Sequence, residues 1–387
     1  MVPEGWVSKK LGNISSLVTS GSRDWAKFYS DTGSKFIRMT NLRRGGIHLK
    51  MDSLKFVNVA SDSADGKRTS LQAGDILISI TAELGKIGWV PPGLGEAYIN
   101  QHTALVRVKS IESESKFVAY LLCSKPYHRR INALNDAGAK AGLNLATIRS
   151  LPIALPPLSE QKKIAQILST WDQAISAIER LLENSQQRKK GLMQQLLTGK
   201  KRLPGFEEEW KKIELGEALK YQQPTPFLVR STEYSNDFPT PVLTAGKSFL
   251  LGYSDEEFGI YRDVLPTIIF DDFTTASRFV DFPFKVKSSA IKILTSNLGF
   301  SNRYIFEAMQ MIRFKVGGHQ RHWISIFANL VIPCPSFEEQ KAISKVLATA
   351  DHEILALQNC LKSLKKEKKA LMQQLLTGKR RVQVEAE

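Results

Sequence analysis

The sequence has few cysteines and no long apolar run. Its three cysteines, Cys123, Cys334 and Cys360, are scattered and form no Cys-x-x-Cys pair, which excludes a disulfide framework and a cysteine-based zinc site. A membrane-spanning helix needs about 18 consecutive apolar residues, and no such run is present. The opening stretch MVPEGWVSKK lacks the apolar core of a secretory signal. We therefore expect a protein of the reducing cytoplasm.

The motifs of several enzyme classes are also missing. The chain has no Asp/Asn-Pro-Pro-aromatic motif of adenine methyltransferases and no glycine-rich cofactor loop. Around Gly246-Lys247-Ser248, Pro241 stands where a phosphate-binding loop needs its first glycine. We therefore expect no cofactor bound by this chain.

Three groups of polar residues are weak candidates for metal or nuclease chemistry. Asp75 and Glu83 resemble a nuclease carboxylate pair, but Lys86 lies one place too far along the chain for Glu-x-Lys. Asp271 and Asp272 are better interpreted as the end of a strand that fixes a loop than as metal ligands. His319 and His322 lack acidic or cysteine partners nearby in the sequence. The sequence thus predicts neither a metal site nor a catalytic site.

Positive charge is abundant. Lysine and arginine number 54 against 38 acidic residues, which gives a formal net charge of +16. Such an excess favours a polyanionic partner, most often nucleic acid. A protein that is merely basic remains the alternative on this observation alone.

One segment of the chain occurs twice. LMQQLLTGK runs from Leu192 to Lys200 and again from Leu371 to Lys379. The same offset of 179 places LPPLSEQKKIAQIL over CPSFEEQKAISKVL and Asp172 over Asp351 without a gap. This is an internal duplication of a whole segment.

Each copy predicts one long helix of about 60 Å, since apolar residues recur at alternating steps of four and three, as along the seam of a coiled coil. The seam of the first copy contains Ile164, Leu168, Trp171, Ile175, Ile178, Leu182, Ser185, Lys189, Leu192 and Leu196. The seam of the second contains Ile343, Leu347, Ala350, Ile354, Leu357, Leu361, Leu364, Lys368, Leu371 and Leu375.

The helix ends carry signals of their own. Ser336 with Glu339 predicts a capping box, and Gly199 and Gly378 stand where left-handed glycines end helices. We expect the two helices to pack on each other; the alternative is that each packs into its own domain. The lysines within the seams, Lys189 and Lys368, are expected to lie at a solvated edge rather than to set the register.

Globular sequence precedes each helix. Strand-like runs such as GDILISI and TALVRV lie within residues 1–152, and TIIFDDF and SAIKIL lie within residues 203–331. Both segments open alike, with Trp6 and Trp210 shortly before a Leu-Gly pair, whereas their middles share almost nothing. The expected layout is domain 1–152, helix 153–202, domain 203–331 and helix 332–387. Mixed α+β domains with divergent loops suit a protein that reads two different targets at a fixed separation.

The order of these motifs resembles the specificity subunit of type I restriction-modification systems, over essentially the whole chain. The resemblance implies two mixed α/β target recognition domains separated by two long antiparallel coiled-coil helices with pseudo-twofold symmetry. It also implies a bipartite double-stranded DNA target, two methyltransferase (modification) subunits and restriction/translocase subunits as partners. S-adenosylmethionine, ATP and Mg would then belong to those partners. The stretch KKRLPGFEEEW lacks the tandem tetrapeptide repeats of some relatives.

Polar residues in expected loops are candidates for contacts with DNA. Arginine can fork onto guanine, and asparagine or glutamine onto adenine, whereas lysine mostly contacts phosphate. For any single one of them, a solvated loop is an equally good interpretation. The candidates are Arg38, Asn41, Arg43, Arg44, His48, Asn100, Gln101, His102, Lys140 and Asn144 in the first domain, and Thr274, Thr275, Ser277, Arg278, His319, Gln320 and Arg321 in the second.

Two other functions remain possible from the sequence. A scaffold protein could use the helices to join partners and the domains to bind proteins. A stand-alone nuclease or methyltransferase is disfavoured, because its motifs are missing.

Overall fold

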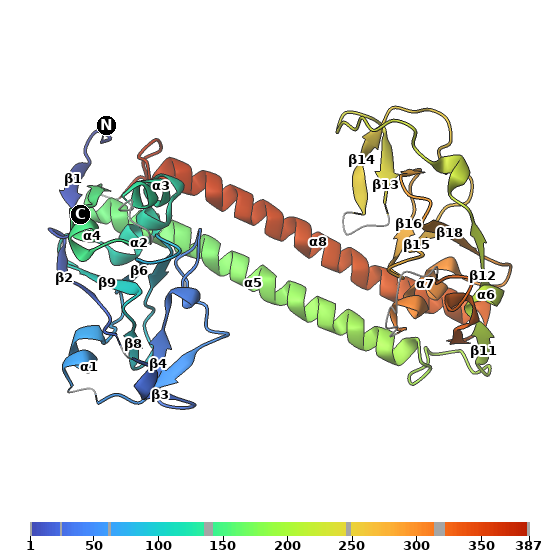
Figure 1. The fold of residues 1–387 in the computed structure, drawn as a ribbon, viewed down its shortest axis with the longest axis horizontal. Coiled ribbons are helices and arrows are strands. Elements are labelled where there is room, and N and C mark those ends of the chain that lie inside the picture. The colour runs from blue at the N-terminus through green and yellow to red at the C-terminus, as the bar shows by residue number, and fades with distance from the viewer. Residues whose placement is uncertain are drawn as a thin grey trace. The chain divides into compact units, whose positions relative to one another are not determined.

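The computed structural model describes residues 2–23, 25–60, 63–134, 142–244, 249–312 and 322–384. The chain forms two compact units, one made of Met1–Ala177 with Leu361–Glu387 and the other of Ile178–Cys360. Each unit contains one sheet-rich domain and parts of two long helices, α5 (Leu158–Leu196) and α8 (Phe337–Leu375) (Figure 1). No helix in the described ranges is long and apolar enough to cross a membrane.

The domain of the first unit is built on three sheets. The first sheet pairs β1 with β10, the first and last strands of the domain. The second has the strand order β2-β9-β6-β7, and the third has the order β3-β5-β4-β8 with β4 and β8 parallel. The strands are β1 (Val7–Lys10), β2 (Ser15–Ser20), β3 (Tyr29–Ser30), β4 (Ser34–Ile37), β5 (Lys55–Val57), β6 (Ile76–Ser79), β7 (Ile87–Trp89), β8 (Ala97–Ile99), β9 (Thr103–Val108) and β10 (Pro152–Leu155).

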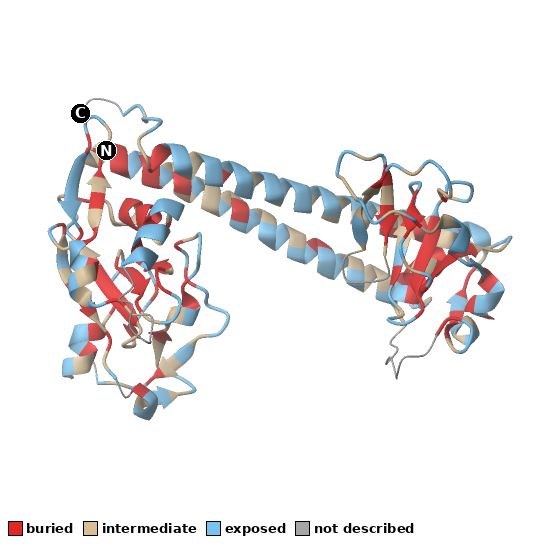
Figure 2. Ribbon diagram, turned by 45° about the horizontal axis from the view of Figure 1, so that its top comes forward, coloured by how far each residue is buried: buried red, intermediate tan, exposed pale blue. Residues whose placement is uncertain are grey.

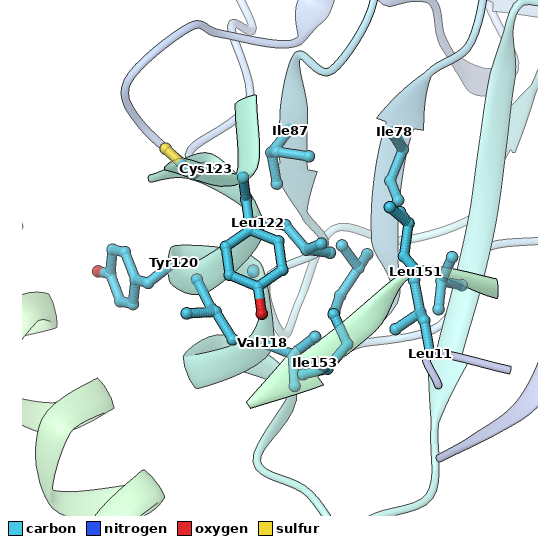
Figure 3. Close-up of a cluster of buried hydrophobic side chains, with 14 of the residues drawn as sticks. Leu11, Ile78, Ile87, Val118, Tyr120, Leu122, Cys123, Leu151 and Ile153 are labelled. Carbon is cyan, nitrogen blue, oxygen red and sulfur yellow. The ribbon is translucent and has the colours of Figure 1, made fainter. Parts of the chain in front are cut away.

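Short helices lie around the sheet β2-β9-β6-β7, which we call the central sheet of this domain. They are α1 (Ala64–Thr69), α2 (Ser115–Cys123), α3 (Lys125–Ala133) and α4 (Leu145–Ser150), with short 3-10 turns at Trp25–Phe28 and Met39–Asn41. Seven consecutive residues of α2, Phe117–Cys123, are buried, because its faces pack on both the sheet and the long helices. Figure 3 shows Ile78 and Ile87 of the sheet with Val118 and Leu122 of α2 in this core.

The domain of the second unit has its own three sheets, ordered β11-β19, β12-β18-β15-β16 and β14-β13-β17. Its strands are β11 (Lys211–Glu214), β12 (Leu219–Gln222), β13 (Thr240–Leu243), β14 (Leu250–Ser254), β15 (Thr267–Asp271), β16 (Ser277–Val280), β17 (Lys285–Val286), β18 (Ile291–Ser296) and β19 (Val331–Cys334). Its helices are α6 (Leu215–Ala218) and α7 (Asn302–Gln310), with 3-10 turns at Thr225–Phe227 and Phe327–Asn329.

The two domains share one topology although their inserts share little sequence. The order β12-β18-β15-β16 repeats β2-β9-β6-β7, and β14-β13-β17 repeats β5-β4-β8, including the parallel pair. Helices α2 and α7 have nine residues each and follow equivalent strands. The expected class is confirmed: two mixed α/β domains with two long antiparallel helices.

The apolar seams of the long helices lie inside both units. In the first unit, Ile164 and Leu168 pack with Leu371 and Leu375. In the second, Leu192 and Leu196 pack with Ile343 and Leu347. The start of one helix thus meets the end of the other. The remaining seam residues, among them Ile175, Leu182, Ile354 and Leu361, are buried or half-buried. The helix faces away from the seams are mostly exposed (Figure 2).

The tryptophan near the start of each domain lies against the glycine at one of the repeated helix ends. Gly378 has a φ of +67°, and a Cβ there would lie 2.5 Å from Cγ of Pro3 and 3.4 Å from the ring of Trp6. Gly199 has a φ of +71°, and a Cβ there would lie 3.4 Å from the ring of Trp210. The glycines therefore end the helices as expected, and at Gly378 a side chain would also collide with Pro3.

A matched arginine–glutamate pair holds each of these junctions. Arg381 donates to both carboxylate oxygens of Glu160 at 2.8 and 2.7 Å. Arg202 donates to both oxygens of Glu339 at 2.7 Å, and Nε1 of Trp210 donates to Glu339 at 3.0 Å. Glu339, expected in a capping box, therefore serves the junction between helix end and domain.

The seam lysines do not lie at a solvated edge, and that expectation was wrong. Lys368 is buried and donates to Asp172. Lys189 is half-buried and donates to Asp351 at 2.7 and 2.8 Å. Since Asp172 and Asp351 are equivalent in the duplication, as are Lys189 and Lys368, the same ion pair forms once in each unit.

Domain side chains complete each ion pair differently. In the first unit, the hydroxyl of Tyr120 donates to Asp172 at 2.6 Å, and Nε2 of His48 lies 3.2 Å from it. In the second, Glu307 takes the place of Tyr120 and lies 3.2 Å from Lys189. Glu307 and Asp351 also accept hydrogen bonds from Arg303. Each domain is thereby fixed to its helix pair at one buried polar cluster.

Burial alone would raise the pKa of Asp172, but hydrogen bonds from His48, Lys368 and Tyr120 and the charge of Lys368 lower it from 3.8 to about 2. Because the pKa is lower in the folded state, the carboxylate contributes stability above pH 4 and loses it as the pH falls toward 2. The shift corresponds to about 2 kcal/mol at neutral pH.

We predict that Asp172→Asn lowers the free energy of unfolding of the first unit by about 2 kcal/mol at pH 7. The difference from the unmodified chain should fall to roughly half by pH 3, since the carboxyl of the unfolded chain is then mostly protonated and must lose its proton on folding. Hydrogen exchange of the buried α2 amides measures this difference. Asp52→Asn, at an exposed residue of the same unit, is the control and should show no pH-dependent difference. If the free energy of unfolding of Asp172→Asn were lower by the same amount from pH 7 to pH 3, the role of the carboxylate would be contradicted.

Candidate nucleic-acid interface

Three loops of the first domain meet at one end of the central sheet. The backbone N–H of Ile80, just after β6, donates to the carbonyl of His102 at 3.1 Å. The N–H of Leu143 donates to the carbonyl of Ile80 at 2.9 Å. Residues 80–86, 100–102 and 142–144 therefore form one continuous edge, which we call the rim of the first domain.

The second domain has the same rim. The N–H of Asp272, just after β15, donates to the carbonyl of Ala290 at 2.9 Å, and the N–H of His322 donates to the carbonyl of Asp272 at 3.0 Å. These bonds join residues 272–276, 287–290 and 322 as their counterparts are joined in the first domain. The two rims thus have equivalent backbones and different side chains.

The first rim carries an ordered chain of polar side chains. Oγ1 of Thr81 lies 2.8 Å from Nδ1 of His102, and Nε2 of Gln101 lies 3.1 Å from Nε2 of the same ring. Since the Gln101 amide can only donate through its nitrogen, a neutral His102 accepts at Nε2 and donates from Nδ1 to Thr81. The carbonyl oxygen of Gln101 and its second N–H then remain to contact a base edge.

A loop with two exposed arginines borders the first rim. Arg43 and Arg44 are exposed, and Arg44 lies 3.4 Å from Glu83 of the rim. Lys86 donates to the same carboxylate, and this hydrogen bond, together with the charges of Lys86 and Arg44, lowers the pKa of Glu83. The exposed pair of Arg44 with Glu83 is weak, so Arg44 can exchange this contact for phosphate.

Three sequence-derived candidates have structural tasks. Asn41 is fully buried; its oxygen accepts from the N–H of Arg38 at 3.0 Å, and its nitrogen donates to the carbonyl of Lys50 at 2.9 Å. Asn41 as a base-reading residue is therefore wrong. The guanidinium of Arg38 donates to the carbonyl of Ser53 at 3.1 Å. Asn144 is exposed, but its oxygen accepts from the N–H of Thr147 at 2.8 Å and caps α4.

Two candidates of the second domain, Thr274 and Thr275, lie on the tight turn between β15 and β16, and Arg278 lies in β16. Asp271 accepts from the N–H of Phe273 at 3.0 Å and from the hydroxyl of Thr274. Thr275 has a φ of +61°, as the tight turn requires. Arg278 is exposed, with its guanidinium 6.0 Å from the ring of Phe249. Thr274 and Arg278 therefore reach solvent beside the rim.

The aspartates considered for catalysis serve the fold. Both oxygens of Asp75, which is fully buried, accept from Arg107 at 2.8 Å. Asp271 ends a strand and fixes the turn that follows it, as expected. Asp272 accepts from the N–H of Trp323 at 2.8 Å. Within the described ranges, no group of three His, Cys, Asp or Glu residues could hold a metal ion.

Several sequence-derived candidates lie outside the described residues. These are Lys140, His319, Gln320 and Arg321, together with Gly246, Lys247 and Ser248 of the stretch that resembles a phosphate-binding loop. Conversely, sequence reasoning missed Thr81 and Lys287 as rim residues. Their positions directly after strands could have indicated them, since Thr81 follows the apolar run ILISI and Lys287 follows the short strand β17.

Comparison with known proteins relates this geometry to one family. The model of the type I restriction modification DNA specificity domain matches residues 3–185. The chain is 46% identical over 147 residues to the EcoR124I/EcoR124II type I restriction enzyme specificity subunit of Escherichia coli, and the match covers 36% of each chain. It is 28% identical over 424 residues to the putative MjaX type I restriction enzyme specificity subunit of Methanocaldococcus jannaschii, which covers 98% of this chain and 95% of the relative.

A solved structure shows the same fold. The S subunit of the type I restriction-modification system from M. genitalium matches with a TM-score of 0.70 at 16% identity. The match covers 96% of both chains. At this identity the likeness concerns the fold alone.

We predict that Asn41→Ala and Arg43→Ala have opposite profiles. Asn41→Ala should lower the free energy of unfolding by about 1–3 kcal/mol, because it removes two hydrogen bonds of a buried side chain to the backbone. Arg43→Ala should leave stability unchanged and weaken DNA binding, with a salt dependence of affinity that is smaller by about one charge. Thermal unfolding and a salt titration of DNA affinity measure the two effects. A stable Asn41→Ala protein with altered sequence preference would restore Asn41 as a reading residue.

Proposed function

Because this chain belongs to the family of type I restriction-modification specificity subunits, we propose that its two domains each read one half of a split DNA sequence through the rims. The observation that carries this proposal is the pair of equivalent rims with different side chains. A shared backbone places both rims in the same relation to their own helix pair, and the side chains select different bases.

The charge of the chain supports DNA as the ligand. A net charge of +16 attracts a polyanion, and exposed cations border both rims, among them Arg43, Arg44 and Lys287. Gln101 of the first rim has the amide geometry that pairs with adenine. The alternative of a scaffold with protein-binding domains is not favoured by the comparisons.

The chain supplies specificity, and the chemistry belongs to other subunits of the system. We propose that S-adenosylmethionine, ATP and Mg are bound by those partners. The duplicated helices present related sequences, with LMQQLLTGK identical in both, which suits two copies of one methyltransferase subunit. Restriction subunits would join this complex.

We predict that the two half-sites can be exchanged separately. Replacing residues 20–135 by the matching insert of a relative should change one half of the methylated motif, because the first rim loops at 80–86 and 100–102 are exchanged. The second half and the spacer should be unchanged, since α5, α8 and the second domain are retained. Methylome sequencing of a host that carries the chimera reads both halves at once.

A matched control replaces residues 211–331 by the relative's second domain, and this chimera should change only the other half. Changes in both halves, or a changed spacer, in either chimera would show that the two domains do not read independently.

A further inference from the structure

Phe273 is an exposed aromatic side chain on the rim of the second domain. It is 40% exposed and follows Asp272, whose backbone joins the three loops of this rim. The equivalent residue of the first rim is Thr81, whose hydroxyl is hydrogen-bonded to His102. The same backbone position is therefore apolar in one domain and polar in the other.

The turn that carries Phe273 is ordered by its own hydrogen bonds. The carboxylate of Asp271 accepts from the N–H of Phe273 at 3.0 Å, and its carbonyl accepts from the N–H of Thr275 at 2.8 Å. The N–H of Asp271 donates to the carbonyl of Ala276 at 2.8 Å. The backbone that carries the ring is thus ordered before any ligand binds, which lowers the entropy cost of binding.

Two other exposed aromatic rings of this unit, Phe258 and Tyr221, differ from Phe273. Phe258 lies with Lys285 4.3 Å and Arg230 4.6 Å from its centroid, and Tyr221 lies 5.2 Å from Lys292. Those rings are engaged by cations of the chain itself. Among the described residues, no cation lies over the ring of Phe273, so its apolar surface remains for a ligand.

The partner of an apolar ring on a DNA-reading edge is set by the chemistry of DNA. Phosphates are charged and sugar contacts carry no sequence information, and three of the four bases present only donors and acceptors in the major groove. Thymine alone adds an apolar group, its 5-methyl, which Phe can contact. Resting on the proposed function, we propose that Phe273 contacts the methyl group of a thymine in the half-site read by the second domain.

The contact belongs to one half-site only. In the first domain, Thr81 occupies the equivalent position and its hydroxyl is already engaged by His102. Removing thymine methyl groups should therefore affect the two halves of the target differently.

The test uses the complex of this chain with its methyltransferase subunits and a duplex that carries the motif found by methylome sequencing. Each thymine is replaced in turn by uracil, which lacks only the methyl group. One replacement, in the second domain's half-site, should weaken binding about fourfold, the value expected for one buried methyl. Phe273→Ala should bind the thymine and uracil duplexes with equal affinity.

A matched control separates this contact from general damage. Phe282→Ala removes another exposed phenylalanine of the same domain, 39% exposed and outside the rim, and should keep the fourfold preference for thymine. Both variants should unfold at the same temperature as the unmodified chain, and Phe273→Leu, which keeps an apolar side chain, should keep part of the preference.

Other outcomes overturn the proposal. If no thymine of the second half-site shows the preference, or if Phe273→Ala keeps it, Phe273 does not contact a methyl group, although sequence-dependent binding of the motif would still support the proposed function. If the complex binds the motif no better than unrelated DNA, the proposed function itself is wrong.

Discussion

The lysine–aspartate pairs between the long helices, one buried and one half-buried, are the constraint on which the remaining structure depends. Lys368 with Asp172, and Lys189 with Asp351, place charges inside seams that are otherwise mostly apolar. A buried charge without its partner is costly, whereas an apolar seam alone tolerates slippage by a turn. Only one antiparallel register brings both lysines onto both aspartates. Each pair also anchors a domain, through Tyr120 in one unit and Glu307 in the other.

The duplication gives the chain two copies of one frame, and the domains use that frame for different side chains. In both units, a tryptophan near the start of the domain packs on a left-handed glycine at a helix end, and an arginine–glutamate pair holds the junction. In both domains, the same backbone hydrogen bonds join three loops into a rim. The rim of the first domain presents an ordered Gln101–His102–Thr81 chain, whereas that of the second presents Phe273 and Thr274. Two frames of one kind with unlike rims are what recognition of an asymmetric target requires.

The periodic parts of this fold could be predicted from the sequence, because helix periodicity fixes which residues share a face. The seam residues and the glycines at the helix ends are of this kind. The role of the seam lysines was not predictable in the same way, because their partners lie on the other helix and are known only once the register is known. The shared topology of the two domains could not be recognised from similarity between their inserts, since many different apolar side chains can fill equivalent buried strand positions.

Candidate residues in loops were the least predictable part of the site. Asn41 has the side chain of a base-reading residue, yet it is buried by the loop that it holds together. Asp271 was easier to interpret, because an aspartate at the end of an apolar strand commonly fixes the following turn. Whether a polar loop residue faces solvent or its own backbone depends on the path of the loop, which short-range patterns do not determine.

Methylome sequencing of the host with and without this gene tests the central claim most directly. The account predicts that loss of the gene abolishes adenine methylation at one motif made of two different half-sites separated by a fixed spacer. Retention of every methylated motif, or loss of a single uninterrupted motif, would contradict it.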